Sequence, residues 1–375
     1  MVSPVKERNS MITIKHPVDF PEAYPLDRIG PKEELLFFDI ETTGFSGDTS
    51  QLYLIGCVYH DGFGWKLIQW FADTRQAEAE LLDAFFAFIK RFKTLIHFNG
   101  DRFDIPYLEK CCRRLGLPHS FEGMESLDIY RKIRPFQKLL GLERMKQKAI
   151  EQFLGISRED KYTGGQLIEV YRDYLRTHEK SLYDLLILHN EDDLKGMPAI
   201  LPILSYADFF SSPVSAQTCE LWDDDSKGAL DTPLLHLDGT GSVSLPVPLE
   251  YSSGPVSLEL YKEKAVCNIR LCRGCLKYFY PNYKDYYYLP FEDTAVHKSV
   301  GEYVDRSARK KATARTCYTK KEGLFLPQFG PFKEPAFRED YRSSLTYVLY
   351  DGSLFSQPKA ADTYLCQLFN WLRKQ

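Results

Sequence analysis

Two carboxylates lie two residues apart where a predicted strand ends. Asp39 and Glu41 belong to the segment ELLFFDIETTGF and directly follow its apolar residues. Because side chains alternate along a strand, both carboxylates point to the same face. Charged groups at the end of a buried strand need a cation or a hydrogen-bond network to replace lost water. Taken alone, the pair favours solvated acids at a strand end, and a metal site is the interpretation that the motifs below favour.

A third acid, Asp104, follows another predicted strand. In the segment HFNGDRFDIPYL, the run Thr94–Phe98 predicts a short buried strand, and the pair Asn99 and Gly100 predicts a turn. Asp104 then stands immediately before a predicted helix. Such an aspartate either caps the helix N-terminus or joins the first two acids.

The third group of polar residues lies on a predicted amphipathic helix, LYDLLILHNEDDL, over Leu182–Leu194. His189 and Asp193 are spaced i, i+4 and share one face of this helix. Asp192 lies about 100° away around the helix axis. An ordinary solvated helix face is the alternative interpretation.

Taken in chain order, D-x-E, N-G-x-x-F-D and H-N-x-x-D resemble the motifs of the DnaQ-like, or DEDD, 3′–5′ exonucleases of the ribonuclease-H-like superfamily. The resemblance is to the YprB-type branch and covers roughly residues 32–204. It implies that four carboxylates bind metal ions, namely Asp39, Glu41, Asp104 and Asp193. It also implies that His189 orients or deprotonates the attacking water, and that the substrate contacts Thr42, Gly44, Asn99 and Phe103.

The spacing around the last aspartate departs from the family pattern. The histidine form of the motif usually has four residues between the histidine and the aspartate, whereas three residues separate His189 from Asp193. The choice between Asp192 and Asp193 as the last metal ligand therefore stays open.

Hydrolysis of a phosphodiester explains why four acids would gather. Two divalent ions about 3.5–4 Å apart can stabilise the attacking and leaving oxygens and lower the pKa of bound water. Mg²⁺ and Mn²⁺ prefer carboxylate and water oxygens, so two such ions are the expected cofactors. The expected partner is the single-stranded 3′ end of DNA or RNA, and no residue pattern chooses between the two nucleic acids.

Two further signals have structural alternatives. Asp128, in SLDIYRKIRP, is either an acid that supports the metal ligands or the N-cap of the next helix. Cys272 and Cys275 form one C-x-x-C pair, and incidental thiols are favoured over a zinc site.

The order of predicted elements indicates an α/β fold. Three strand-like runs within residues 34–72 predict an antiparallel meander. A helix at Arg75–Phe92, a strand at Thr94–Phe98, a helix at Ile105–Leu115, a strand near Glu125–Ile129 and helices through Ser205 follow. This is the ribonuclease-H-like pattern of a mixed sheet with three antiparallel strands, then alternating strands and helices, flanked by helices.

Composition shifts divide the chain into four parts. We expect an N-terminal extension at 1–31, the ribonuclease-H-like domain at 32–205, a linker rich in Ser, Pro, Gly and Asp at 206–257, and a smaller α+β domain at 258–375. In the last part, VSLELYKEKAVCNIRLC, KDYYYLPF and SSLTYVLYD predict strands. Helices are predicted at Ser299–Thr316 and Asp362–Arg373.

The composition is that of an ordinary folded protein. Of the 375 residues, 44% are hydrophobic and 27% are charged, which argues against a mainly disordered chain. The longest apolar runs fall short of the ~18 residues of a membrane span. The N-terminus lacks the apolar core of a signal peptide, and the odd number of nine cysteines indicates reduced thiols in a cytoplasmic protein.

The charge is unevenly distributed. Residues 270–321 hold twelve Lys/Arg and five Asp/Glu, a net charge of +7. Because the whole chain has a net charge of −4, the other residues together carry −11. Six tyrosines within Tyr278–Tyr288 accompany this basic segment, which suits stacking of bases and neutralisation of phosphates, although tyrosines at the edges of a strand-rich core are the alternative. The sequence thus predicts a nuclease, and a catalytically weak nucleic-acid-binding or adaptor protein is the second hypothesis.

Overall fold

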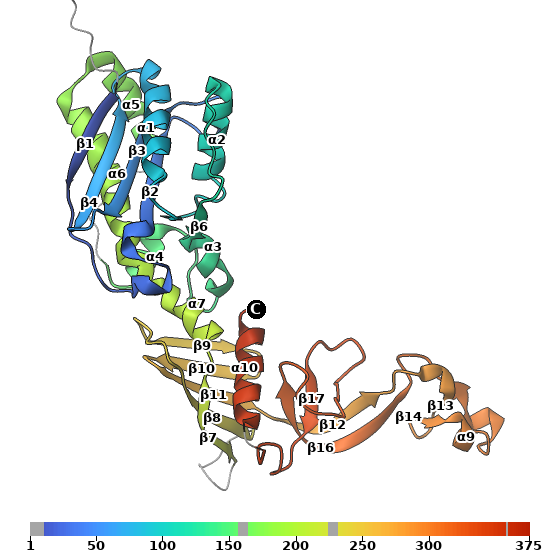
Figure 1. The fold of residues 1–375 in the computed structure, drawn as a ribbon. Helices are drawn as coiled ribbons and strands as arrows, with labels where there is room; N and C mark the ends of the chain where they lie inside the picture. The colour runs from blue at the N-terminus through green and yellow to red at the C-terminus, as the bar shows by residue number, and fades with distance from the viewer. Residues whose placement is uncertain (1–10, 157–163, 224–231, 358) are drawn as a thin grey trace, which may run out of the picture. The chain divides into compact units, whose positions relative to one another are not determined.

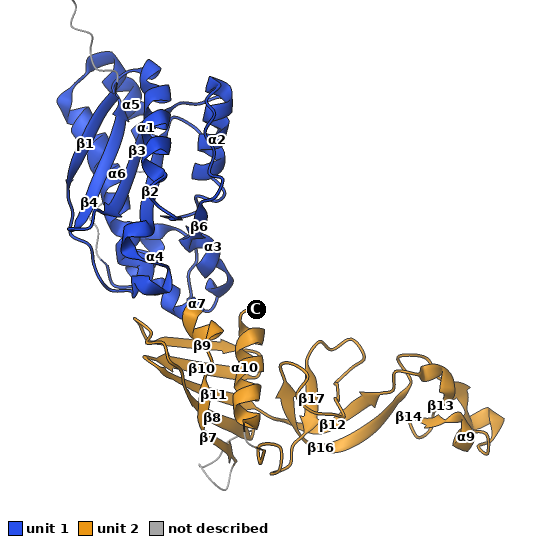
Figure 2. Cartoon of the chain, viewed as in Figure 1, with its two compact units in different colours: residues 1–207 blue, residues 208–375 orange. Residues whose placement is uncertain are grey.

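The computed structural model describes residues 11–156, 164–223, 232–357 and 359–375. The chain forms two compact units that divide after Ala207 (Figure 2). Among the described residues, unit 1 contains one sheet and unit 2 contains three. No helix within the described ranges is long and apolar enough to cross a membrane.

Unit 1 is built on a six-stranded mixed sheet with the order β1-β4-β3-β2-β5-β6 (Figure 1). Pairing is antiparallel from β1 to β2, whereas β5 pairs in parallel with both β2 and β6. The fold class predicted for this part is therefore confirmed. Its strands are β1 (Met11–Pro17), β2 (Leu35–Thr42), β3 (Leu52–His60), β4 (Trp65–Ala72), β5 (Thr94–His97) and β6 (Glu125–Asp128).

Strand β1 lies in the predicted N-terminal extension and adds an edge to the meander. Its side chains alternate between half-buried and exposed, as expected for an edge strand with one covered face. By contrast, every residue of the central strand β3 is buried. A strand buried along its whole length must be covered on both faces of the sheet.

Helices α1 (Glu78–Ile89) and α6 (Lys180–Ile200) cover opposite faces of this sheet. Consecutive residues of β2 demonstrate the arrangement, because Phe38 packs against Phe85 of α1 while Asp39 faces Asn190 of α6. Helix α1 forms because its apolar residues recur at helical spacing and are buried together. The remaining helices of unit 1 are α2 (Asp104–Leu115), α3 (Ile129–Ile133), α4 (Gln147–Phe153) and α5 (Gly164–Thr177), and α7 (Leu204–Ser211) crosses the division between the units.

Unit 2 begins with a five-stranded antiparallel sheet of order β7-β8-β11-β10-β9. Its elements are β7 (Ser215–Trp222), β8 (Leu234–Thr240), β9 (Leu249–Ser253), β10 (Val256–Tyr261) and β11 (Lys264–Arg270), with helix α10 (Ala360–Leu372) packing on β7. The C-terminal helix is thus confirmed.

The prediction of a linker at 206–257 is wrong for its described residues. They form α7, β7, β8, β9 and the start of β10. The physical reason is visible in β8, where buried Leu235 and Leu237 alternate with half-buried His236 and Asp238. Serine, glycine and aspartate on the outer face and in the turns conceal this period of two.

Two smaller sheets complete unit 2. One is β12 (Cys272–Phe279), β16 (Tyr318–Gln328) and β17 (Thr346–Leu349), and the other is β13 (Tyr286–Leu289), β14 (Thr294–His297) and β15 (Lys310–Lys311). The predicted helix at Ser299–Thr316 is wrong, since only the short helix α9 (Lys298–Gly301) and a 3-10 turn precede β15. Seven of the 18 residues of that segment are charged, and two of its larger apolar side chains stay exposed, Val300 at 62% and Tyr303 at 91%, so no burial stabilises a long helix there.

Candidate active site

The first two predicted ligands face helix α6 from strand β2. The Asn190 side-chain amide donates a hydrogen bond of 2.9 Å to Oδ2 of Asp39. Two residues further along β2, Oε1 of Glu41 lies 3.7 Å from Nε2 of His189. Side-chain alternation along β2 therefore directs both carboxylates to the α6 face of the sheet.

Gly56 allows α6 to lie this close to the sheet. It sits on β3 directly opposite Asp39 in the antiparallel pairing. A Cβ atom at Gly56 would lie 2.1 Å from Asn190 Oδ1 and 2.4 Å from Leu194 Cδ1. Any larger residue would push the helix away from the two carboxylates.

A buried amide pair fixes the orientation of Asn190. Gln69, on β4, donates one hydrogen bond of 2.9 Å to Asn190 Oδ1 and another of 3.0 Å to the carbonyl of Ile187. Both amide side chains are completely buried. Because Asn190 Oδ1 accepts from Gln69, its Nδ2 is directed at Asp39. Sequence reasoning missed Gln69, although a polar residue within the apolar run of β4 was the available signal.

His189 and Asp193 lie one helical turn apart on α6 and approach each other. His189 Nε2 is 3.4 Å from Asp193 Oδ2. Together with Glu41 they offer three possible ligand atoms, one from each side chain. These three atoms all lie within 4.8 Å of one another. Asp192 is not a member of this group. The geometry therefore favours Asp193 as the last carboxylate of the set.

Asp104 reaches the same region from helix α2. It is the first residue of the helix and is only 5% exposed, and the residue before it, Phe103, occupies the N-cap position. The Asp104 carboxylate accepts hydrogen bonds from its own backbone N–H and from that of Ile40. Since Ile40 lies between Asp39 and Glu41, the Asp104 carboxyl lies near theirs, and because Phe103 is the N-cap of α2, the N-cap alternative is wrong.

The carboxyl groups raise one another's pKa values. The pKa of Asp39 lies well above its usual range because of burial and the charges of Glu41, Asp104 and Asp193. Burial, followed by the charge of Asp193, raises the pKa of Glu41 to about 8, although the hydroxyl of Tyr53 partly offsets this. Burial also raises the pKa of Asp104 to about 7. A divalent cation would relieve this repulsion, so the donor set of carboxylates with one imidazole fits a hard metal ion.

The turn after β5 delivers Asp104 and is held by Asp128. The Asp128 carboxylate accepts hydrogen bonds from the backbone N–H groups of Asn99 at 2.9 Å, Asp101 at 3.3 Å and Arg131 at 3.2 Å. Asp128 is therefore the N-cap of α3 and also the anchor of the Asn99 turn. Asn99 itself adopts the left-handed conformation, with φ of +66°.

A second group of possible metal ligands, His97, Asp101 and Asp128, surrounds this turn. His97 Nδ1 accepts from the N–H of Gly100 at 3.0 Å, and its Nε2 lies 2.8 Å from the hydroxyl of Ser126. The nitrogens of His97 thus have protein partners, and the group supports the loop.

The other residues expected to contact substrate lie at the end of β2 and in the segments that follow β2 and β5. Thr42 ends β2, and its hydroxyl donates to the carbonyl of Gly44 at 2.7 Å. Phe103 precedes Asp104, and its ring centroid is 5.7 Å from that of Tyr107. Thr42, Gly44, Asn99 and Phe103 are all half-buried.

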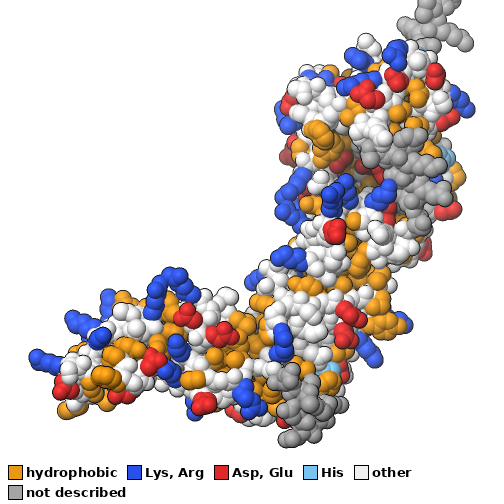
Figure 3. Space-filling model, turned by 180° about the vertical axis from the view of Figure 1, so that it is seen from behind, with side chains coloured by type: hydrophobic (Ala, Val, Ile, Leu, Met, Phe, Trp, Pro, Cys, Tyr) orange, Lys and Arg blue, Asp and Glu red, His pale blue; other side chains and the backbone are white. Residues whose placement is uncertain are grey.

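The tyrosines of unit 2 mostly pack against one another and against cations. Tyr280 and Tyr286 stack with ring centroids 4.6 Å apart, and Lys277 lies over the ring of Tyr318. Two aromatic rings remain strongly exposed, Phe291 at 84% and Tyr303 at 91%. In the space-filling view, Lys and Arg side chains lie on both units and are interspersed with Asp and Glu on unit 2 (Figure 3). Cys272 and Cys275 are free thiols, and neither belongs to a ligand group among the described residues.

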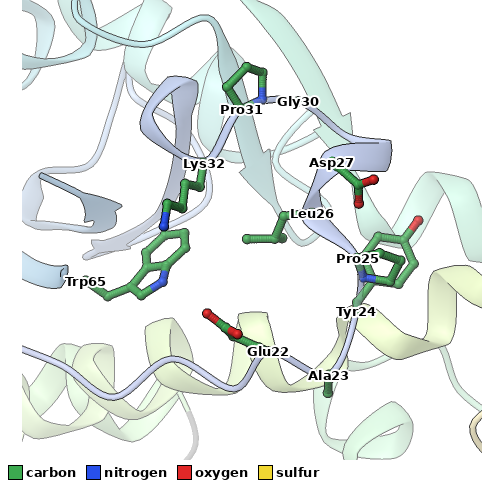
Figure 4. A pocket seen from close by; sticks show the side chains of 10 residues that line it. All are labelled: Glu22, Ala23, Tyr24, Pro25, Leu26, Asp27, Gly30, Pro31, Lys32 and Trp65. Carbon is green, nitrogen blue, oxygen red and sulfur yellow. The ribbon is translucent and has the colours of Figure 1, made fainter. Parts of the chain in front are cut away.

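One cavity, of about 710 Å³, lies away from this chemistry. Leu26, Trp65 and Glu22 face it (Figure 4), and none of the predicted site residues lines it. The candidate site is therefore identified by its carboxylates and their hydrogen bonds rather than by cavity size.

Comparisons with known proteins agree with the fold of unit 1. Residues 36–204 match the family model of the RNase_H superfamily. A DNA polymerase of Thermococcus kodakarensis is 30% identical over an alignment of 129 residues that covers 30% of this chain and 8% of that protein. A DNA polymerase of Pyrococcus glycovorans is 30% identical over 139 residues, 32% of this chain and 18% of the polymerase. The chain thus covers only a small part of these relatives.

Two solved structures show weaker similarity. The family B DNA polymerase from Pyrobaculum calidifontis aligns with a TM-score of 0.39 at 17% identity, covering 48% of this chain and 26% of the polymerase. A product-bound exonuclease I aligns with a TM-score of 0.30 at 12% identity, covering 55% and 58% of the two chains. The family match over residues 36–204 agrees with the six-stranded mixed sheet, which has a ribonuclease-H-like fold.

Proposed function

We propose that this protein is a metal-dependent nuclease of the DEDD type that hydrolyses phosphodiester bonds from the 3′ end of a single strand of DNA or RNA. The observation that carries the proposal is the convergence of carboxylates from three separate elements. Asp39 and Glu41 come from β2, Asp104 from α2 and Asp193 from α6. Mutual repulsion among buried acids is tolerated where a cation binds between them.

Each side chain has a distinct task in this proposal. The four carboxylates hold the metal ions, and Asn190 fixes the direction of the Asp39 carboxylate through its 2.9 Å hydrogen bond. His189, between Glu41 and Asp193, accepts the proton of the attacking water or orients that water. Bound Mg²⁺ or Mn²⁺ would supply Lewis-acid stabilisation of the transition state and a lower pKa for the water.

The comparisons support nucleic acid as the partner, because the matched relatives are DNA polymerases. The motif resemblance supports the YprB-type branch and the 3′ to 5′ direction. In unit 2, the net positive segment 270–321 is suited to holding the strand.

A catalytically weak binding or adaptor protein is less well supported. Four clustered acids would repel phosphate unless a metal ion neutralises them, so a protein that only binds nucleic acid would gain nothing from this cluster.

The test uses end-labelled single-stranded and duplex DNA and RNA with Mg²⁺ or Mn²⁺. We expect the wild-type protein to shorten linear strands progressively from the 3′ end and to leave a circular single strand intact. Asp39→Ala should abolish the ladder, whereas Asp184→Asn, on an exposed part of α6, should not. The proposal fails if the wild type gives no ladder, if Asp39→Ala is equally active, or if the circle is cut.

A further inference from the structure

A second polar cavity, of about 410 Å³, opens beside the end of strand β2. Its wall begins at Thr43, two residues after Glu41, and continues through the turn to Gln51 and the start of α1. Helix α5 closes the other side with Tyr171 and Arg172. Three arginines line the cavity, namely Arg75, Arg114 and Arg172.

The two acids that line the cavity are already neutralised. Glu78 is buried, and its Oε1 accepts a hydrogen bond of 2.8 Å from Arg114 Nη2 and another of 2.8 Å from the backbone N–H of Leu52. Asp48 lies 3.8 Å from the ammonium of Lys110. Arg114 is held in place by a further bond of 2.7 Å to the carbonyl of Gly47.

Arg75 and Arg172 supply the remaining positive charge, and of these two only Arg75 lacks a side-chain partner among the described residues. Arg75 has no hydrogen-bond or ion-pair partner for its guanidinium in the described part of the chain, and only its carbonyl is engaged, by Gln51. Arg172 forms an ion pair with Glu169, a neighbour on the same exposed helix surface that does not line the cavity. The hydroxyl of Thr43, which accepts from the N–H of Gln51, keeps its proton for a further acceptor.

A short chain of contacts joins this cavity to the carboxylates. Tyr53 donates a hydrogen bond of 3.4 Å to Glu41. The same ring stacks on Tyr171 of the cavity wall, with centroids 4.2 Å apart. The carboxylate site and the cavity thus lie on either side of one stacked pair of tyrosines.

We propose that this cavity is a phosphate-binding subsite, in which Arg75 and Arg172 hold a backbone phosphate of the nucleic-acid strand whose terminal bond lies at the carboxylates. Guanidinium groups match the geometry of phosphate oxygens, and a hydroxyl donor beside them is typical of backbone recognition. The inference rests on the proposed function for the identity of the strand. The subsite would add positively charged contacts, which attract the strand toward a carboxylate site that is itself acidic.

The experiment measures binding without cleavage. In an Asp39→Asn background, the anisotropy of a fluorescent single strand of about 12 nucleotides is titrated at several salt concentrations. We expect Arg75→Glu and Arg172→Glu each to weaken binding by about tenfold and to reduce the salt slope by about 0.7. Arg75→Lys, which keeps the charge, should retain the slope. Arg176→Glu, on the same helix but outside the cavity, is the matched control.

Each outcome is decisive because the background does not cleave, so an inactive enzyme would not obscure the result. The subsite is overturned if the two charge reversals bind the strand as well as the Arg176→Glu control does. A second arm measures thermal stabilisation by inorganic phosphate and by a mononucleotide. If these ligands protect the parent but not Arg75→Glu, while affinity for the strand is unchanged, the cavity binds a free phosphate compound and the strand proposal is wrong.

Discussion

Asn190 donates a hydrogen bond of 2.9 Å to Asp39, a residue 151 positions earlier in the chain. The same amide accepts from Gln69, so a buried line of hydrogen bonds runs from β4 through α6 to β2. Groups that orient metal ligands are nearly as important to metal affinity as the ligands themselves. Asn190 is therefore a positioning residue for the proposed reaction.

Replacement of Asn190 by leucine should loosen the Asp39 carboxylate while it keeps the side-chain volume similar. We expect Mn²⁺ affinity, measured by isothermal titration, to fall by about 10- to 100-fold. Asp184→Asn, at an exposed position of the same helix, should bind Mn²⁺ as the wild type does. Equal affinities in the two variants would show that the hydrogen bond does not position Asp39.

Gly56→Ala tests the close approach of α6 to β3. The added methyl would lie 2.1 Å from Asn190 Oδ1, so helix and sheet must separate. We expect a loss of about 1–3 kcal/mol in the free energy of unfolding, together with a loss of nuclease activity. Gly64→Ala is the control, since its methyl would meet no atom within 4 Å. Denaturant titration of both variants checks the difference.

The two adjacent aspartates of α6, Asp192 and Asp193, should respond differently to substitution. Asp193 lies 3.4 Å from His189 and shares a ligand group with Glu41, whereas Asp192 is outside that group. Asp193→Asn should lower kcat by about 100-fold or more, and Asp192→Asn should retain most of the activity. Steady-state kinetics at saturating Mn²⁺ would make the assignment, and the opposite ranking would transfer the metal-ligand role to Asp192.

The stability of the metal-free protein should fall as pH rises. The pKa of Glu41 is raised from 4.5 to about 8 and that of Asp104 from 3.8 to about 7. A carboxyl with a higher pKa in the folded chain holds its proton more tightly there, so stability is lost as pH rises from the unfolded pKa to the folded pKa.

This effect can be measured by thermal unfolding in chelator. We expect a lower Tm at pH 8 than at pH 6, and a smaller difference in the Glu41→Gln variant. Mn²⁺ should raise Tm, and more strongly at pH 8, because protons and metal compete for the same oxygens. An apo Tm that rises between pH 6 and pH 8, in wild type and variant alike, would contradict the site electrostatics.

The basic segment of unit 2 should contribute to strand binding through its charges. Lys310 and Lys311 form the exposed strand β15. If both contact phosphates, Lys310→Glu with Lys311→Glu should reduce the salt slope of single-strand binding by about 1.4. Lys264→Glu, an exposed change outside the segment, should leave the slope as it was. If the double variant has the same salt slope as Lys264→Glu, the Lys310 and Lys311 side chains do not contact the strand.

Local patterns in the sequence were sufficient for most of unit 1. Apolar periodicity predicted strands β2 to β5 and helices α1, α2 and α6, because each buries one face or both faces in a shared core. The same reasoning failed where the pattern was weak. Polar outer faces concealed the strands at 215–222 and 234–240, and evenly spaced charges imitated a helix at 299–316.

By itself, the sequence determined which candidate site residues share a face. The period of two along β2 places Asp39 and Glu41 on one face of the strand, and the i, i+4 spacing places His189 and Asp193 on one face of the helix. Only the tertiary structure decided that Asp104 bonds to Ile40, that Gln69 orients Asn190, and that arginines from different elements line one cavity. Those relationships depend on strand register and on the distance between helix and sheet. Both are fixed by packing among residues far apart in the chain, and local periodicity in the sequence does not predict that packing.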